Sequence, residues 1–111
     1  MSEPDWLEMM LERACIGHLK KFGVTPQLIV AMEEGGELIQ ALSKFYRLRE
    51  GYIFEEYMKP GITHNLIEEI VDMEIMIAQL KIIFKPFDHI YERTREEKIT
   101  RAFDRVSGEI E

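Results

Sequence analysis

The sequence predicts an all-α protein built from four antiparallel helices, and three observations support this fold class. Apolar residues recur at intervals of three and four along four segments of the chain, which is the spacing of one face of a helix. Glycine and proline separate these segments, and the connections between them are short, as in antiparallel bundles. No segment alternates apolar and polar residues over the length of a strand, so we expect no sheet.

The ends of the helices follow from residues with known positional preferences. Asp5 can cap the first helix, and Gly23 ends it. Thr25 followed by Pro26 starts the second helix, because a capping residue and then proline is a favourable first turn. The remaining ends are assigned in the same way to Gly51, Pro60, Gly61, Thr63, Pro86 and Gly108. The predicted helices cover residues 5–22, 26–49, 63–85 and 87–106.

The length of the chain allows one domain, which we assign to residues 1–111. Each of the two central helices carries a main apolar face and a second, flanking stripe, which is more apolar surface than one four-helix unit of this size covers. The main faces are Leu28, Met32, Gly35, Ile39, Leu42 and Tyr46, and then Leu66, Ile70, Met73, Ile77, Leu80 and Phe84. We therefore expect a homodimer or a homotetramer.

The net charge and the cysteine content argue against several classes of function and cellular setting. The formal net charge of −7 argues against a basic surface for duplex nucleic acid. The one cysteine, Cys15, allows no intrachain disulfide and is expected in the core, and a reducing cytoplasm is the expected setting. The first residues lack the basic start and apolar run of a signal peptide, and no apolar run of about 18 residues could span a membrane.

Two carboxylates interrupt the flanking stripe of each central helix. In the second helix this stripe is Val30, Glu34, Glu37, Ala41, Phe45 and Leu48. In the third helix it is Asn65, Glu69, Asp72, Met76, Gln79 and Ile83. The carboxylates of each pair are three residues apart, so they are neighbours on the helix surface. If the two stripes face each other, Glu34, Glu37, Glu69 and Asp72 meet in a partly buried space.

Four such carboxylates suit a bound cation, because repulsion and burial otherwise disfavour their ionised forms. Oxygen-only ligands favour Mg²⁺, with Mn²⁺ as a substitute, over zinc. The alternative is that all four are ordinary solvated helix residues, but two pairs matched in spacing and stripe position favour the metal site. Di-iron and zinc chemistry fit less well, because neither pair includes histidine, and His18, His64 and His89 are scattered and expected at the surface or at helix ends.

Two further features accompany the acidic pairs. Gly35 and Gly36 lie within the second helix, where glycine is unfavourable. Close helix packing is the preferred explanation for Gly35, and the alternative is that both glycines clear space beside the acidic pair.

The fourth helix has a stripe that begins apolar and becomes basic: Phe87, Tyr91, Thr94, Lys98, Arg101 and Arg105. Its three cations suit phosphate groups, although cations late in a helix also interact favourably with the helix dipole.

In order along the chain, these residues resemble the motifs of MazG-like nucleotide pyrophosphohydrolases. Residues 33–44 begin Glu33-Glu34-Gly35-Gly36-Glu37 and are similar to the EExxE segment of that family. Residues 68–76 are similar to its ExxD segment, and residues 98–101 to a C-terminal KxxR of some short members. The resemblance covers roughly residues 26–105. The stretch from 38 to 68 is longer than is usual in the family, and residues 52–58 are expected to form an extra turn.

The resemblance implies an all-α, Mg²⁺-dependent, dimeric or tetrameric enzyme that hydrolyses (deoxy)nucleoside triphosphates to (d)NMP and pyrophosphate. By motif, the metal ligands would be Glu34, Glu37, Glu69 and Asp72. Glu33 would either support these ligands or act as the general base. Lys98 and Arg101 would hold the outer phosphates, with Arg105 on the same stripe.

Two other interpretations stay open at this point. The chain could be a non-catalytic helical oligomer that binds a cation or nucleotide as a regulatory module. It could also be a phosphoribosyl-ATP pyrophosphohydrolase, an enzyme that shares the helical fold. The sequence favours no particular nucleobase. The aromatic residues within 52–57 are expected to pack between protomers, with stacking on a base as the alternative.

Overall fold

The structure, a computed structural model, describes residues 5–50 and 60–110. Over these residues it contains four α-helices, one short 3-10 helix and no strand, so the all-α prediction is confirmed. The elements are α1 (Asp5–Phe22), α2 (Val24–Glu50), α4 (Pro60–Ile83), η1 (Lys85–Phe87) and α5 (Asp88–Ile110). The end assigned to Gly51 and the extra turn expected at 52–58 lie outside the described residues.

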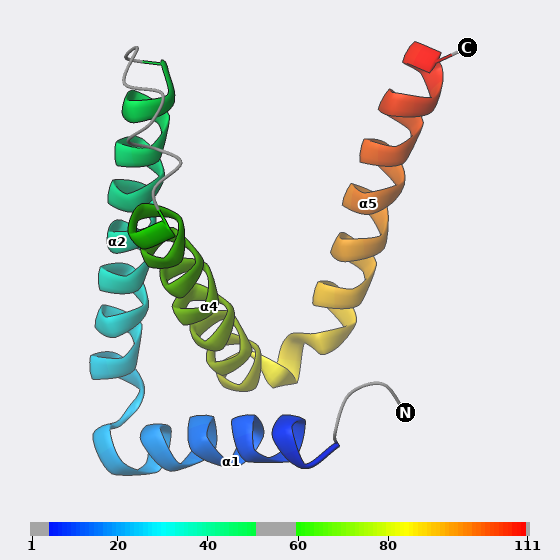
Figure 1. The fold of residues 1–111 in the computed structure, drawn as a ribbon. Helices are drawn as coiled ribbons and strands as arrows, with labels where there is room; N and C mark the ends of the chain where they lie inside the picture. Colours follow the sequence, from blue (N-terminus) through cyan, green and yellow to red (C-terminus); the bar gives the residue numbers. More distant parts are fainter. Residues whose placement is uncertain (1–4, 51–59, 111) are drawn as a thin grey trace.

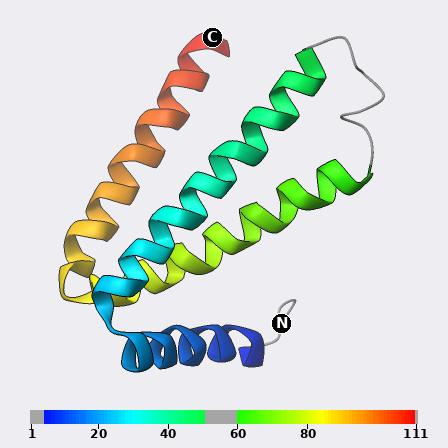
Figure 2. The same cartoon turned by 90° about the vertical axis from the view of Figure 1, so that its left-hand side faces the viewer.

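The centre of the fold is an antiparallel pair formed by α2 and α4, and α1 lies across one end of this pair (Figures 1 and 2). The residues buried most fully lie where these three helices meet: Cys15, Gln27, Ala31, Met76 and Gln79. The prediction that Cys15 is a core residue is therefore confirmed. Two of the five are polar, so this small core contains amides as well as apolar side chains.

The turn between α1 and α2 requires glycine. Gly23 has φ of 86°, a left-handed conformation that side chains with a Cβ rarely adopt, and its N–H donates to the carbonyl of Leu19 at 2.9 Å. The predicted end of the first helix is thus confirmed. The third predicted helix begins earlier than expected, because Pro60 and Gly61 form its first turn instead of preceding it. Proline is favourable there, since the first N–H of a helix has no intrahelical partner.

The fourth helix does not close a bundle within one chain, as the antiparallel prediction expected. Figure 1 shows α5 leaving the end of α4 at η1 and diverging from α2 and α4. Every side chain of α5 from Asp88 to Val106 is exposed. Pro86 interrupts the helix at this bend. The helix α5 is polar on average, and its apolar side chains, Ile99, Phe103 and Val106 among them, are exposed. The helix also continues past Gly108, which was expected to end it.

The main apolar faces are a second correction. The side chains of Met32, Ile39 and Tyr46 on α2 are 68%, 69% and 66% exposed. The stripes that contain the carboxylates supply the most buried residues of the seam between α2 and α4, Met76 and Gln79 among them, while Gly35 and Met73 of the main faces also lie next to each other there. Helical periodicity identifies both stripes but does not say which one the chain covers by itself. None of the described helices is long and apolar enough to cross a membrane.

Candidate functional site

A single antiparallel register aligns the polar residues of the α2–α4 seam. The side-chain amide of Gln79 donates to the side-chain oxygen of Gln27 at 2.7 Å, and this contact shows which residues of the two helices lie opposite each other. Gln27 and Glu34 are seven positions apart, and so are Asp72 and Gln79. The same register therefore places Glu34 opposite Asp72, about two helical turns from the amide pair.

The acidic residues predicted from the sequence lie about two helical turns from the amide pair, where Glu34 is opposite Asp72. Glu34, Glu37 and Glu69 each offer a carboxylate oxygen within 4.8 Å of the others. Asp72 is close enough for its charge to raise the pKa of both Glu34 and Glu69. The structure thus brings three of the four predicted carboxylates together, and Asp72 acts on them through its charge without belonging to the group within 4.8 Å. We call these four residues the acidic cluster.

Burial is the largest cause of the raised pKa of Glu34, followed by the charges of Glu37, Asp72 and Glu33. Burial also comes first in raising the pKa of Glu69, followed by the charges of Glu37, Asp72 and Glu34 and a hydrogen bond with Glu37. One oxygen of Glu34 and one of Glu69 are buried without a hydrogen-bond partner. Such oxygens are unfavourable unless another group contacts them.

The donor set of the acidic cluster fits a hard divalent cation. All four groups offer oxygen, and the two unpartnered oxygens are positions that a cation would satisfy. Glu34 and Glu69 are half-buried in the seam, whereas Glu37 and Asp72 are exposed at its edge. The cluster is therefore anchored on one side and open on the other, so a ligand or water could reach a cation bound there.

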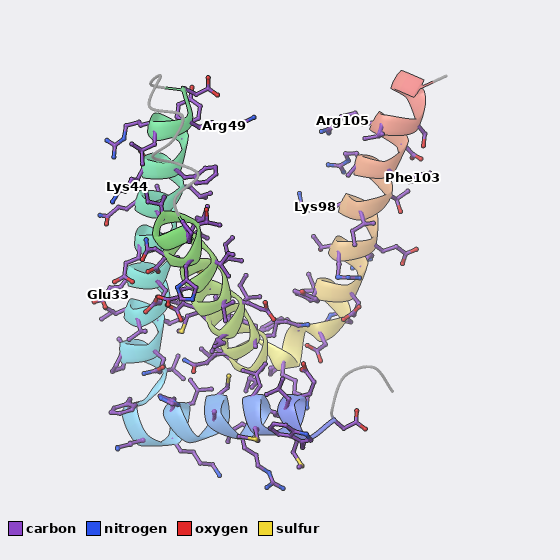
Figure 3. The ribbon with its side chains drawn as sticks, in the orientation of Figure 1. Glu33, Lys44, Arg49, Lys98, Phe103 and Arg105 are labelled. Atoms are coloured by element: carbon purple, nitrogen blue, oxygen red, sulfur yellow. The ribbon has the colours of Figure 1, made fainter. Side chains whose placement is uncertain are left out.

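Glu33 lies apart from the acidic cluster. Its side chain is exposed and projects from the side of α2 turned away from α4 (Figure 3). Its charge is the last of the causes that raise the pKa of Glu34. Glu33 therefore affects the acidic cluster through its charge, which raises the pKa of Glu34.

The two glycines in α2 are not explained by contacts within the chain. A Cβ at Gly35 would lie 4.0 Å from the sulfur of Met73, which is an ordinary van der Waals distance. A Cβ at Gly36 would meet nothing within 4 Å. Close packing of α2 against α4, our preferred explanation for Gly35, therefore does not require glycine. Glycine at these positions leaves open space next to Glu34 and Glu37.

The basic residues of α5 are not brought to the acidic cluster within one chain. Lys98, Arg101 and Arg105 are exposed, and α5 diverges from α2 and α4. Figure 3 shows Lys98 and Arg105 on the side of α5 turned toward the central pair, with Phe103 on the opposite side. Arg101 borders a shallow hollow on α5 together with Glu97 and Asp104. Lys98 and Arg105 therefore face the central pair, but the basic stripe lies away from the acidic cluster of its own chain.

A groove beside the cluster was missed in the sequence. It is a cavity of about 450 Å³ between α1, α2 and α4, and its lining includes His18, Phe22, Val30, Gln27, Met76 and Gln79. The available signal was the seven-residue spacing that places Gln27 and Gln79 on the same stripes as the carboxylates. That signal becomes visible only when the α2–α4 register is known.

The histidines behave as expected for surface and helix-end residues where their contacts are described. The Nδ1 atom of His18 lies 2.8 Å from the carbonyl oxygen of Ala14, and that of His64 lies 3.1 Å from a carboxylate oxygen of Glu68.

Burial raises the pKa of the Cys15 thiol, which opposes a role as a nucleophile. The aromatic residues within 52–57 lie outside the described residues.

Comparison of the chain with protein-family models, with curated protein sequences and with solved structures found no significant match.

Proposed function

We propose that the protein hydrolyses (deoxy)nucleoside triphosphates to (d)NMP and pyrophosphate with Mg²⁺ as its cofactor and Mn²⁺ as a substitute. The observation that carries this proposal is the convergence of Glu34, Glu37 and Glu69 within 4.8 Å, with unpartnered buried oxygens on two of them. The resemblance to MazG-like pyrophosphohydrolases supplies the bond that is cut. One cysteine fits a reducing compartment, and we place the reaction in the cytoplasm.

In this proposal the four carboxylates hold the cation, with Glu34 and Glu69 from inside the seam and Glu37 and Asp72 from its edge. When bound, the cation would neutralise phosphate charge and act as a Lewis acid toward the triphosphate. The carboxylate stripes include no serine, cysteine or histidine, so water is the attacking group. Glu33 remains a candidate for the base or for support of the ligands.

The basic stripe of α5 would bind the outer phosphates and stabilise the leaving pyrophosphate. Because Lys98, Arg101 and Arg105 lie away from the cluster of their own chain, we propose that assembly into a homodimer or homotetramer brings such a stripe to each cluster. The exposed apolar face of α2, which includes Met32, Ile39 and Tyr46, offers surface for this contact. Light scattering should give a mass of at least twice 13.1 kDa at micromolar concentration, and a monomer would contradict the assembly.

Product analysis by phosphorus NMR tests the reaction. The common NTPs and dNTPs, together with phosphoribosyl-ATP, are incubated with the protein and Mg²⁺. Pyrophosphate and a nucleoside monophosphate should appear together from the first time point. Orthophosphate as the initial product would contradict cleavage between the α and β phosphates. Turnover of phosphoribosyl-ATP alone would assign that narrower activity.

The alternative of a non-catalytic regulatory module has one observation in its favour, since unpartnered carboxylate oxygens fit cation binding whether or not chemistry follows. Calorimetry with Mg²⁺ separates the two proposals when it is combined with the NMR screen. Cation binding without turnover of any tested nucleotide would favour the regulatory module.

A further inference from the structure

We propose that the groove between α1, α2 and α4 binds the nucleobase of the substrate, and that the paired amides of Gln27 and Gln79 contact the polar edge of the base. The identity of this ligand rests on the proposed nucleotide substrate. The groove itself is defined by observations that are independent of the acidic cluster.

The amide pair provides unused hydrogen-bonding groups at a buried position. Gln27 and Gln79 are 6% and 4% exposed, and both line the groove. Each side chain has two N–H donors and one carbonyl acceptor, and their mutual contact uses one donor and one acceptor. Among the described residues the two amides have no other hydrogen-bond partner. The unused donors and acceptor are not among the side-chain atoms that are fully buried without a partner, so they remain accessible to a polar ligand in the groove.

The walls around the amide pair are apolar and aromatic. Val30, Ile75 and Met76 lie along the seam, and Phe22 and His18 contribute rings whose centroids are 5.9 Å apart. A nucleobase has apolar flat faces and a polar edge with neighbouring donors and acceptors. A cavity of about 450 Å³ is within the range of roughly 300–1,000 Å³ that is usual for small-molecule sites. The groove therefore matches the chemistry of a base better than that of a purely apolar ligand.

The position of the groove connects it to the acidic cluster. On each helix the amide and the carboxylate are seven positions apart, Gln27 from Glu34 and Gln79 from Asp72, which corresponds to about 10.5 Å along the helix axis. Val30 and Met76 occupy the turn between them on the same two stripes. A nucleotide lying along the seam with its base in the groove would extend its sugar and phosphates toward the carboxylates. This arrangement assigns base recognition to α2 and α4 themselves, with α1 as the outer wall.

Free nucleosides test the groove without metal or catalysis. Adenosine, guanosine, cytidine, uridine and thymidine are added to the 111-residue chain in the presence of a chelator, and the side-chain amide signals are followed by NMR. At least one nucleoside should shift the signals of Gln27 and Gln79 and leave that of Gln40, which is exposed on α2, in place. No shift with any nucleoside, or shifts confined to other residues, would overturn the proposal.

The double variant Gln27→Leu/Gln79→Leu tests the role of the amides in turnover. Replacing both partners avoids leaving one buried amide alone. The KM for nucleotides should rise about tenfold, whereas hydrolysis of inorganic tripolyphosphate and binding of Mg²⁺ should stay at the wild-type level. Gln40→Leu is the matched control and should change none of these quantities. An unchanged KM in a folded double variant would overturn base recognition and leave the proposed reaction intact.

A second variant covers the case in which the double variant does not fold. Ala14 is exposed and lines the groove, so Ala14→Trp should obstruct the groove without altering the seam. It should abolish the nucleoside-induced shifts and leave Mg²⁺ binding unchanged. Nucleoside binding in a protein that turns over no nucleotide would support the groove as a base site and contradict the proposed reaction. Shifts that persist in Ala14→Trp would place the base elsewhere.

Discussion

The helices α4 and α5 are nearly equal in length, at 24 and 23 residues, and one short turn joins them, yet they have opposite surroundings. One face of α4 is buried against α2 and α1, and it contains Glu69, Met76 and Gln79. From Asp88 to Val106 every side chain of α5 is exposed. The comparison shows that the polar chemistry of the seam depends on tertiary packing, whereas α5 carries its cations on an exposed surface.

The two regions also differ in the charge that they would present to a ligand. In the seam, burial and mutual repulsion raise the pKa of Glu34 and Glu69. On α5, Arg101 lies beside Glu97 and Asp104 in an exposed hollow, where solvent screens the charges. Loss of a carboxylate in the acidic cluster should therefore lower turnover more than loss of a cation on α5.

The largest effect is expected for Glu37→Gln. This change removes a charge at the edge of the cluster without removing packing, so turnover should fall on the order of a thousandfold or more while the helical content is unchanged. Pyrophosphate release and circular dichroism measure the two quantities. Glu74→Gln, an exposed carboxylate of α4 outside the cluster, is the control and should retain activity. Full activity in Glu37→Gln would remove the acidic cluster from the mechanism.

A smaller effect is expected for Lys98→Ala on α5. The KM for nucleotides should rise about tenfold, because one charge-assisted phosphate contact is lost, and Mg²⁺ affinity should hardly change. Arg93→Ala, on another face of α5, is the control. If α5 of one protomer serves the cluster of another, mixing Lys98→Ala with Glu37→Gln protein should restore part of the activity. No restoration in a confirmed mixed oligomer would place both groups in the same chain.

The third prediction concerns pH and the metal-free protein. The pKa of Glu34 is raised in the folded state, so the folded protein binds this proton more tightly than the unfolded protein does. The resulting stabilisation is complete below the unfolded pKa, near 4.5, and is lost as the pH rises through the folded pKa. With a chelator at pH 7, Glu34→Gln should melt a few degrees above the wild type, and this difference should shrink toward pH 4.5. A constant difference in Tm across this range would contradict it.

Gly36→Ala separates stability from activity. Alanine is favoured over glycine within a helix, and a Cβ there meets nothing, so the free energy of unfolding should rise by about 0.5–1 kcal/mol. If the open space beside Glu37 admits substrate, turnover should fall at the same time. Gly17→Ala in α1 also adds a Cβ in open space and should raise stability without loss of activity. Equal activity in both variants would show that the space at Gly36 is unused.

The smallest effect is expected where α4 joins α5. The amino group of Lys81 on α4 lies 4.8 Å from the centre of the Tyr91 ring on α5. An exposed cation–π contact of this kind contributes about 0.5 kcal/mol. A double-mutant cycle with Lys81→Ala and Tyr91→Leu, followed by denaturant unfolding, should give a coupling of that size. A coupling of zero would mean that the local bend alone sets the direction of α5.

The sequence was sufficient to predict the class of fold and the glycine that ends α1, because these depend on local propensity and helical periodicity. Periodicity also placed the two acidic pairs on matched stripes, and the packing of α2 on α4 then brings Glu34, Glu37 and Glu69 together. It did not reveal that Met32 and Ile39 would be exposed, since periodicity gives two apolar stripes in α2 and no rule for choosing between them. The open position of α5 was also missed, because periodicity does not show whether the apolar side chains of a helix pack against its own chain. The Gln27–Gln79 pair joins residues 52 positions apart, so it required the register between the helices.

The shared register of α2 and α4 limits how the distance between the groove and the acidic cluster can change in related sequences. One residue turns a helix by about 100°, so a single insertion between Gln27 and Glu34 would rotate one of them out of the seam. An insertion of three or four residues would keep both on the seam and lengthen the distance by about 5.4 Å, provided that α4 gained a matching turn between Asp72 and Gln79. The distance between the groove and the acidic cluster can therefore change only by whole helical turns. A longer ligand that spans both would require paired insertions in α2 and α4.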